Sequence, residues 1–335
     1  MENQSDVPAS PVSPAPRDPA GGVRAVVSHI VHRREAAIFL ALVLILVGIT
    51  VVAPNFVSGS NLHILSRQIS FVALVALGQL FVILHGGIDL SVGSIMALAG
   101  MVAAYCMKIE INPVLAVLLG TGAGLVMGAI NGVLIAYTRL APFIATLGML
   151  SFASGMVLGL TKGVPITEIP ESFLPVAQGD LFGIAIPVWI TLVVAIAVHV
   201  VLTYTAFGRR VYAMGGNEQA TFLSGVNVRR IKLALYMISA GAAALAGIIL
   251  VSRFNSAQAD TGKGWELDSI AAAVIGGTSL SGGSGSVLGV LIGACIMGVI
   301  QSGLVQMHIS SYWHTAIIGV IIVLAALLDR AKRRG

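Results

Sequence analysis

The sequence contains little charge. Asp, Glu, Lys and Arg make up only 10% of its 335 residues, whereas 57% are apolar. Soluble globular proteins have about 25% charged residues, so this chain lacks the charge to cover soluble domains of its length. Its mean hydropathy of +0.96 points the same way. We therefore expect an all-α polytopic membrane protein.

Cysteine is also scarce, and the motifs of common enzymes are missing. Cys106 and Cys295 lie in apolar stretches without paired spacing, which is typical of small buried hydrophobes. The sequence contains no Gly-x-x-x-x-Gly-Lys-Ser/Thr loop for phosphate, no His-Glu-x-x-His and no Gly-x-Ser-x-Gly. The histidines are scattered, without the spacing of metal ligands. We therefore expect no enzyme activity, and no cofactor or metal bound by this chain.

Long apolar stretches recur along most of the chain. A helix needs about 20 apolar residues to cross a bilayer. Two of the stretches, the third and the eighth, are short and border glycine-rich turns, where we expect short or broken helices. About ten transmembrane helices are predicted, at residues 36–53, 69–85, 92–107, 113–137, 142–160, 186–205, 233–251, 267–280, 287–305 and 314–328.

The distribution of basic residues predicts the orientation. Cytoplasmic loops of membrane proteins carry an excess of Lys and Arg. If the N-terminus is cytoplasmic, then Arg139, the segment 206–232 and the basic end 330–335 lie on that side too. Residues 1–35, a proline-rich tail and a basic juxtamembrane stretch, are expected to be disordered. Both termini are thus predicted to be cytoplasmic, with a permease domain at 36–329 and no affinity for nucleic acid.

A polar island interrupts the apolar sequence at residues 207–232, which we call the basic island. It reads FGRRVYAMGGNEQATFLSGVNVRRIK and has one acid, Glu218. Residues 217–225 predict a short amphipathic helix that Gly225 ends. We interpret this helix as the binding site of a soluble partner, because the chain has little other polar surface. The basic residues are interpreted mainly as topology signals, most clearly Arg229, Arg230 and Lys232.

Glycines recur at intervals of four in two of the predicted spans. Such stripes let the backbones of two membrane helices approach closely. We prefer packing within one subunit, with a dimer interface as the alternative. The stripes consist of Gly120, Gly124, Gly128 and Gly132, and of Gly285, Gly289 and Gly293.

The pattern GGxxLSxGS occurs twice, at residues 86–94 and 276–284. Repeats in transporters often place broken helices near the substrate path, although chance similarity is the alternative. The first copy holds Asp89, and buried acids in membranes are usually functional. Asp89 is either a pathway residue or a cap of the third span beside Ser91. Further pathway candidates are Ser91, Asn131 and Thr146, and the candidates for the outer mouth are Glu266 and Asp268.

Four stretches together resemble the sugar-permease family of bacterial ATP-binding-cassette importers, typified by ribose permeases. They read GGIDLSVGSIMALAGMVAA at 86–104, APFIATLGML at 141–150, FGRRVYAMGGNEQATFLSGVNV at 207–228 and WELDSIAAAVIGGTSLSGGSGSVLGVLIGA at 265–294. The resemblance implies a multi-pass protein of the bacterial inner membrane that imports a monosaccharide. It also implies a homodimer, a cytoplasmic ATPase that binds the ATP and Mg, and a periplasmic or extracellular sugar-binding protein.

The basic island then matches the coupling loop of that family. Glu218, Gln219 and Ala220 stand where the loop has Glu-Ala-Ala, and Gly225 stands at its glycine. Gln219 departs from the strict motif. The resemblance implies that this segment moves as a lever when ATP closes the ATPase and switches the sugar path. The predicted ATPase-coupling residues are Asn217, Glu218, Gln219, Ala220, Ser224 and Gly225.

Other functions remain open at this stage. An ion-coupled secondary transporter would need no ATPase and would use Asp89 as its coupling acid, so an uncoupler would stop its uptake. A non-transporting membrane scaffold would move no solute in vesicles. A branched-chain amino-acid permease of related type differs only in substrate.

Overall fold

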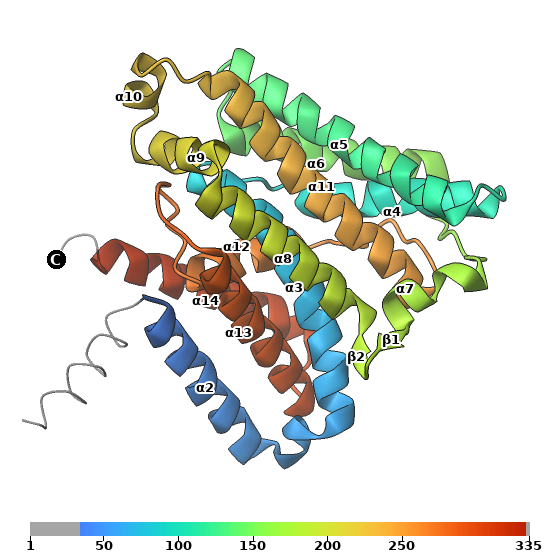
Figure 1. Ribbon diagram of the computed structural model, residues 1–335. Helices are drawn as coiled ribbons and strands as arrows, with labels where there is room; N and C mark the ends of the chain where they lie inside the picture. Colours follow the sequence, from blue (N-terminus) through green and yellow to red (C-terminus); the bar gives the residue numbers. More distant parts are fainter. Residues whose placement is uncertain (1–33, 333–335) are drawn as a thin grey trace, which may run out of the picture.

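The computed structural model describes residues 34–332, which form a bundle of helices (Figure 1). Two short 3-10 helices, η1 (Pro54–Val57) and η2 (Glu171–Phe173), and a two-residue hairpin, β1 (Asp180–Leu181) with β2 (Ile184–Ala185), lie between α-helices. The α-helices are α2 (Arg34–Val52), α3 (Gly59–Leu84), α4 (Val92–Lys108), α5 (Pro113–Tyr137), α6 (Pro142–Thr161), α7 (Pro175–Gln178), α8 (Ile186–Tyr204), α9 (Ala206–Gly216), α10 (Glu218–Leu223), α11 (Val228–Phe254), α12 (Trp265–Ile275), α13 (Val287–Gln306) and α14 (Ser311–Lys332).

Each of the ten predicted apolar stretches lies mostly on a helix, which confirms the all-α class. Within the described residues, seven helices are long and apolar enough to cross a membrane, namely α2, α3, α5, α6, α8, α11 and α13. As expected, α4 and α12 are short, with 17 and 11 residues. The prediction of helix to residue 280 was wrong, because Gly276 ends α12 and Gly277 has a φ of +85°. The count of ten spans and the cytoplasmic termini stay predictions.

The tail prediction falls mostly outside the described residues, which begin at Arg34. The same holds for the last residues of the predicted basic end. Within the described range, α14 contacts α12 and α13. The division into a permease domain at 36–329 stays a prediction.

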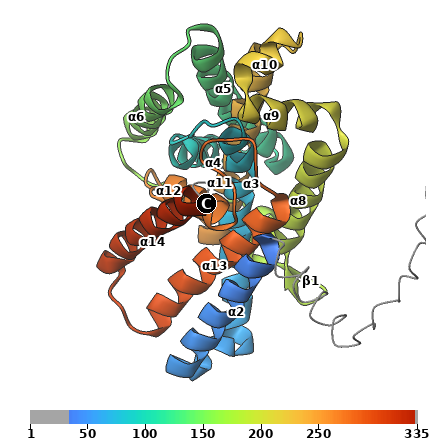
Figure 2. The same cartoon turned by 90° about the vertical axis from the view of Figure 1, so that its left-hand side faces the viewer.

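Helix α3 lies at the centre of the bundle. It contacts α8, α11, α12 and α13, and 83% of its most apolar stretch is buried inside the protein. By contrast, only 6% of the corresponding stretch of α2 is buried. Because both helices are long and apolar enough to cross a membrane, burial inside protein distinguishes the central helix from one that offers its surface to lipid. In the view of Figure 2, α6 lies at the side of the bundle beside α4 and α5.

The glycine stripe of α5 packs against α11 within the same chain. A Cβ added at Gly128 would lie 2.6 Å from the carbonyl oxygen of Tyr236, and one at Gly132 would lie 2.7 Å from Leu233 Cα. An added Cβ at Gly124 would lie 2.5 Å from Ala244 Cβ of α11, and one at Gly120 would lie 2.6 Å from Ala99 O of α4. These contacts place the first stripe at intrachain helix contacts.

The second stripe faces α12 and the turn after it. Gly289 and Gly293 contact the backbone of Gly276 and Ala272, and an added Cβ at Gly285 would lie 2.8 Å from Thr278 Cγ2. Gly285 itself precedes α13, which begins at Val287. The second stripe therefore also joins two helices of one chain.

An ion-pair cluster holds the β1–β2 hairpin at the end of the bundle that carries α7 (Figure 1), which we call the α7 end. Asp180 Oδ1 lies 3.0 Å from Arg67 Nη2 and 2.8 Å from His63 Nε2. Arg67 also donates to the carbonyl oxygen of Gln178 at 2.6 Å. Although desolvation raises the pKa of Asp180, hydrogen bonds and charges from Arg67 and His63 lower it, and the net shift is downward.

This cluster predicts a loss of stability in acid. A carboxyl whose pKa is lowered by folding contributes stability above its ordinary value of 3.8, and that contribution disappears as the pH falls through the lower folded value. Thermal unfolding in detergent should therefore show a steeper acid loss for the wild type than for Asp180→Asn. Asp260→Asn is the control, because Asp260 forms no ion pair in the described part of the chain. Equal acid profiles for Asp180→Asn and the wild type would contradict the prediction.

Candidate functional site

The two copies of the GGxxLSxGS pattern meet in space. The first lies in the loop 85–91 between α3 and α4, and the second in the loop 276–286 between α12 and α13; we call them the first and second glycine loops. Gly283 N donates a hydrogen bond of 2.8 Å to Leu84 O at the edge of the first loop. An added Cβ at Gly282 would lie 2.9 Å from Gly86 N. The loops thus approach backbone to backbone, which only glycine permits at this distance.

Helix α9 of the basic island packs against both glycine loops. An added Cβ at Gly215 would overlap Leu84 O and Gly283 N, so this glycine lies between the two loops. Tyr212 OH donates a hydrogen bond of 2.8 Å to Gly285 O. The neighbouring Gly216 faces open space. The island therefore contacts the interior of the bundle through α9, which the sequence did not predict as a separate helix.

Asp89 is fully buried in the first glycine loop, at 0% exposure. Its Oδ1 accepts hydrogen bonds from Ser91 N at 3.0 Å and Ser91 Oγ at 2.6 Å. Its Oδ2 accepts one from Ser239 Oγ of α11 at 2.9 Å. The bond from Ser91 N closes an Asx-type turn just before α4. It is not a helix cap, because Ser91 is the N-cap residue of α4 and that helix has no side-chain cap hydrogen bond. The bond from Ser239 ties the loop to another helix, α11.

The other three pathway candidates gather around Asp89. Asn131 Nδ2 on α5 donates to Ser91 Oγ at 2.9 Å, and Thr146 Oγ1 on α6 lies 3.2 Å from Ile88 O. Gln79 Nε2 on α3 donates to Asp89 O at 3.2 Å. We call this set of side chains the Asp89 network. It brings together all four candidates from a loop and two helices, and it adds Gln79 and Ser239.

Several polar atoms at or near the Asp89 network lack a protein partner. Gln79 Oε1, Asn131 Oδ1, Tyr236 OH and His85 Nε2 are buried without a hydrogen bond. Each buried polar group without a hydrogen bond costs about 1–3 kcal/mol of folding free energy. This interior is therefore suited to water or a polar ligand rather than to an apolar core. Within residues 34–332, no group of three or more His, Cys, Asp or Glu side chains is placed to hold a metal ion.

Sequence reasoning missed the partners contributed by long helices. Ser239 and Tyr236 lie three residues apart on α11, and Gln79 lies inside the apolar run of α3. Residues three apart share a helix face, and a lone amide in a buried membrane helix is a usable signal. The sequence around Tyr212 and Gly215 carries no such signal, because these residues contact backbone atoms that lie far away along the chain.

The two outer-mouth candidates lie in different surroundings. Glu266 lines a pocket at the α7 end, and its Oε1 accepts from Gly264 N at 3.2 Å. Asp268 Oδ2 instead accepts from Gln301 Nε2 at 2.9 Å, and Gln301 Oε1 accepts from Gln68 Nε2 at 2.9 Å. The structure thus separates the pair, with Glu266 at this pocket and Asp268 in a hydrogen-bonded chain with Gln301 and Gln68.

The predicted coupling residues form a capped short helix. Asn217 Oδ1 accepts from Ala220 N at 2.9 Å at the start of α10, and Ser224 Oγ donates to Ala220 O at 2.9 Å near its end. Gly225 follows with a φ of +82°, the left-handed value that glycine adopts freely. Gln219 is exposed on the same helix. The segment thus has a defined start and stop.

Several charged side chains of the basic island interact with neighbouring side chains. Glu218 Oε1 and Lys232 Nζ lie 2.7 Å apart, so an ion pair joins α10 to α11. Lys232 therefore has a structural role that the topology interpretation left out. Arg229 lies over the ring of Tyr137, 5.7 Å from its centroid. The tip of α10 leaves two large apolar side chains uncovered, with Phe222 61% and Leu223 77% exposed.

Comparison with known proteins gives consistent matches. Residues 61–326 match the family described as "Branched-chain amino acid transport system / permease component". The chain is 43% identical over 303 residues to the ribose import permease protein RbsC of Escherichia coli K12, covering 89% of this chain and 94% of that one. It is 44% identical to RbsC of Bacillus subtilis, with 88% and 92% covered. It is 37% identical to the D-allose transport system permease protein AlsC of E. coli K12, with 82% and 85% covered. No solved structure matches.

Proposed function

The chain belongs to the family of transport-system permease components that its residues 61–326 match, and on that premise we propose that it imports a monosaccharide as the permease of an ATP-binding-cassette importer. Relatives named for ribose and allose support a ribose-like sugar. They favour neither an amino-acid substrate nor an ion-coupled transporter. The energy then comes from a separate ATPase, because this sequence contains no phosphate-binding loop.

The observation that carries the proposal is the exposed apolar tip of α10. Phe222 and Leu223 project from a helix that Asn217 caps and Gly225 ends. Exposed apolar side chains on an otherwise polar segment indicate a protein partner. We assign this partner as the cytoplasmic ATPase, with a groove that receives the tip of α10. A partner bound there could act on the interior of the bundle, because the neighbouring helix α9 contacts both glycine loops.

The proposed orientation places the α9–α10 end in the cytoplasm. Arg209, Arg210, Arg229 and Arg230 lie on these helices and at the start of α11, as the positive-inside rule requires. Both termini are then cytoplasmic, and the protein is a multi-pass protein of the bacterial inner membrane. A homodimer and an external sugar-binding protein at the α7 end complete the proposed importer.

In the proposed mechanism, closure of the ATPase on ATP moves α10 and α9 as a unit. The Glu218–Lys232 ion pair joins α10 to α11, and Gly215 lies against Leu84 and Gly283. Movement of α9 therefore displaces the glycine loops that frame the Asp89 network. Sugar entering from the α7 end passes along Asp89, Ser91, Asn131 and Thr146, where hydroxyl groups find acceptors and donors.

Gly225→Val tests the coupling helix. The φ of +82° strains any branched side chain, by about 1–2 kcal/mol. We expect the amount of ATPase that co-purifies with the permease to fall at least about fivefold, because α10 no longer ends at the same residue. Gly183→Val is the matched control: Gly183 has a φ of +76° and no atom within 4 Å of an added Cβ, but lies in the β1–β2 hairpin at the α7 end. Equal loss in both variants, or none at Gly225, would remove the coupling proposal.

Uptake into vesicles separates the proposal from its rivals. With ATPase and binding protein supplied, labelled D-ribose should accumulate only with ATP, and an uncoupler should leave uptake unchanged. Collapse with the uncoupler at constant ATP would indicate an ion-coupled transporter. Absence of transport for every sugar would indicate a scaffold.

A further inference from the structure

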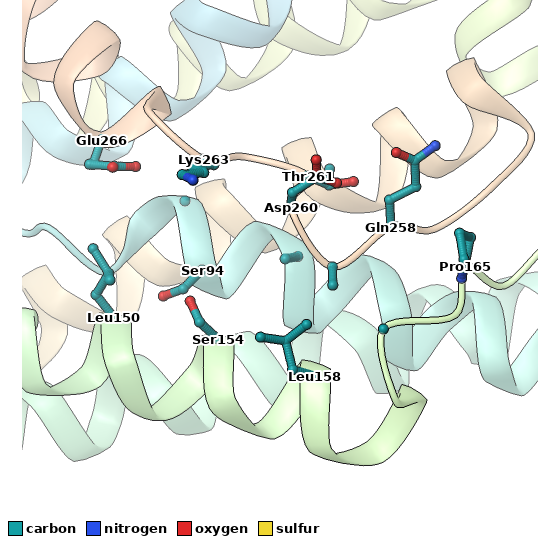
Figure 3. Close-up of a pocket in the computed structure, with 14 residues that line it drawn as sticks. Ser94, Leu150, Ser154, Leu158, Pro165, Gln258, Asp260, Thr261, Lys263 and Glu266 are labelled. Carbon is teal, nitrogen blue, oxygen red and sulfur yellow. The ribbon is translucent and has the colours of Figure 1, made fainter.

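A pocket of about 520 Å³ opens at the α7 end between α4, α6 and the loop 255–264 (Figure 3). Ser94 of α4 and Ser154 of α6 point toward one another across it, and Leu150 and Leu158 of α6 line one wall. The loop contributes Gln258, Asp260, Thr261 and Lys263 to the opposite wall, and the first turn of α12 contributes Glu266. This volume lies within the range of about 300–1,000 Å³ of small-molecule sites.

Two backbone contacts build the pocket from distant segments. The bridge between Ile166 and Ala257 joins the segment after α6 to the loop after α11, with hydrogen bonds of 3.0 and 2.8 Å. Gly93 of α4 lies against the backbone of Gly262, where a side chain would overlap its oxygen. The rim is therefore fixed at two points, while the main contacts of α6 are with α4 and α5.

The side chains in the pocket suit a neutral molecule with several hydroxyl groups. Three hydroxyls, an amide and two carboxylates offer both donors and acceptors, and the leucines offer an apolar wall for C–H groups. Carboxylates outnumber the lining cation Lys263, so the pocket disfavours phosphate and the carboxylate of an amino acid. No aromatic ring lines it, which is compatible with weak, transient binding.

The floor of the pocket leads toward the Asp89 network. Ser94 is buried, with 7% exposure, and its Oγ donates to Ser91 O at 2.9 Å, one helical turn away. Ser91 in turn donates to Asp89. A molecule leaving the pocket inward therefore meets the Asp89 network next.

We propose that this pocket is a monosaccharide-binding subsite of the permease itself, the first protein surface that sugar meets after its binding protein. The inference rests on the proposed function and deepens it. Sugar hydroxyls bond to Ser94, Ser154 and Glu266, and Leu150 and Leu158 cover the apolar face of the ring.

Saturation-transfer NMR on the purified permease in nanodiscs, without ATPase or binding protein, tests the subsite. The probes are D-ribose, D-xylose, L-arabinose and D-allose, with leucine as the competing class. We expect transfer to at least one sugar and none to leucine. Ser154→Leu fills the pocket and Glu266→Gln removes an acceptor, so each should lower the sugar signal about tenfold.

Ser151→Leu is the matched control, because Ser151 is exposed on α6 and does not line the pocket. It should keep the wild-type signal. The subsite is overturned if no sugar gives transfer, if leucine gives an equal signal, or if Ser154→Leu and Ser151→Leu behave alike. Normal ATP-driven uptake beside such a result would leave the proposed function standing. Loss of all uptake in vesicles, with sugar still bound to the pocket, would remove the function and keep the site.

Discussion

Replacing Gly215 by alanine is expected to lower sugar uptake at least about tenfold while the ATPase still co-purifies. The added methyl group would overlap Leu84 O and Gly283 N, which are backbone atoms and cannot rotate away. Helix α9 must then lift from the glycine loops, and motion of α10 no longer reaches them. Uptake into vesicles and the amount of bound ATPase are the two measurements.

Gly216→Ala provides the matched control. Gly216 is the next residue of α9 and has no atom within 4 Å of an added Cβ. The two substitutions are chemically identical, so differences in helix propensity cancel. Uptake should stay near wild type in Gly216→Ala. Similar uptake in the two variants would contradict the role assigned to the contact between α9 and the loops.

Asp89→Leu is expected to lower the apparent melting temperature by about 5 °C or more. Three donors lose their acceptor together, namely Ser91 N, Ser91 Oγ and Ser239 Oγ. The leucine also adds apolar bulk to a fully buried polar position. Thermal unfolding in detergent measures the effect.

Asp89→Asn separates stability from transport at the same position. The amide oxygen can still accept from Ser91, and the amide nitrogen can donate to Ser239 Oγ. We expect the fold to survive within about 1 kcal/mol but uptake to fall, because an acceptor on the proposed sugar path becomes a donor. Full uptake by Asp89→Asn would show that the residue is only a structural anchor.

Much of the fold could be predicted from local sequence. Runs of about 20 apolar residues locate the long helices, and Asn217 with Gly225 marks the start and stop of α10. The glycine stripe of α5 indicated close helix packing, since the spacing repeats on one face. These signals are local, and local signals survive in any tertiary arrangement.

The site was less predictable, because it depends on contacts between distant segments. Asp89 and Asn131 were recognisable as polar residues in apolar surroundings, but nothing in the sequence pairs Asp89 with Ser239. The pocket needs the bridge between Ile166 and Ala257, two residues without distinctive chemistry. Gly215 sits in an ordinary Met-Gly-Gly-Asn stretch, and its importance comes from the backbone that surrounds it.

The hydrogen bond from Gly283 to Leu84 also limits the degrees of freedom of the bundle. It fixes the separation of the two glycine loops, so α4 and α13, which begin after them, share one anchor point. A displacement applied there reaches both helices at once, and neither half of the chain can shift alone without breaking that bond. In the proposed mechanism, the contact of α9 with both glycine loops therefore acts on the two halves of the bundle together.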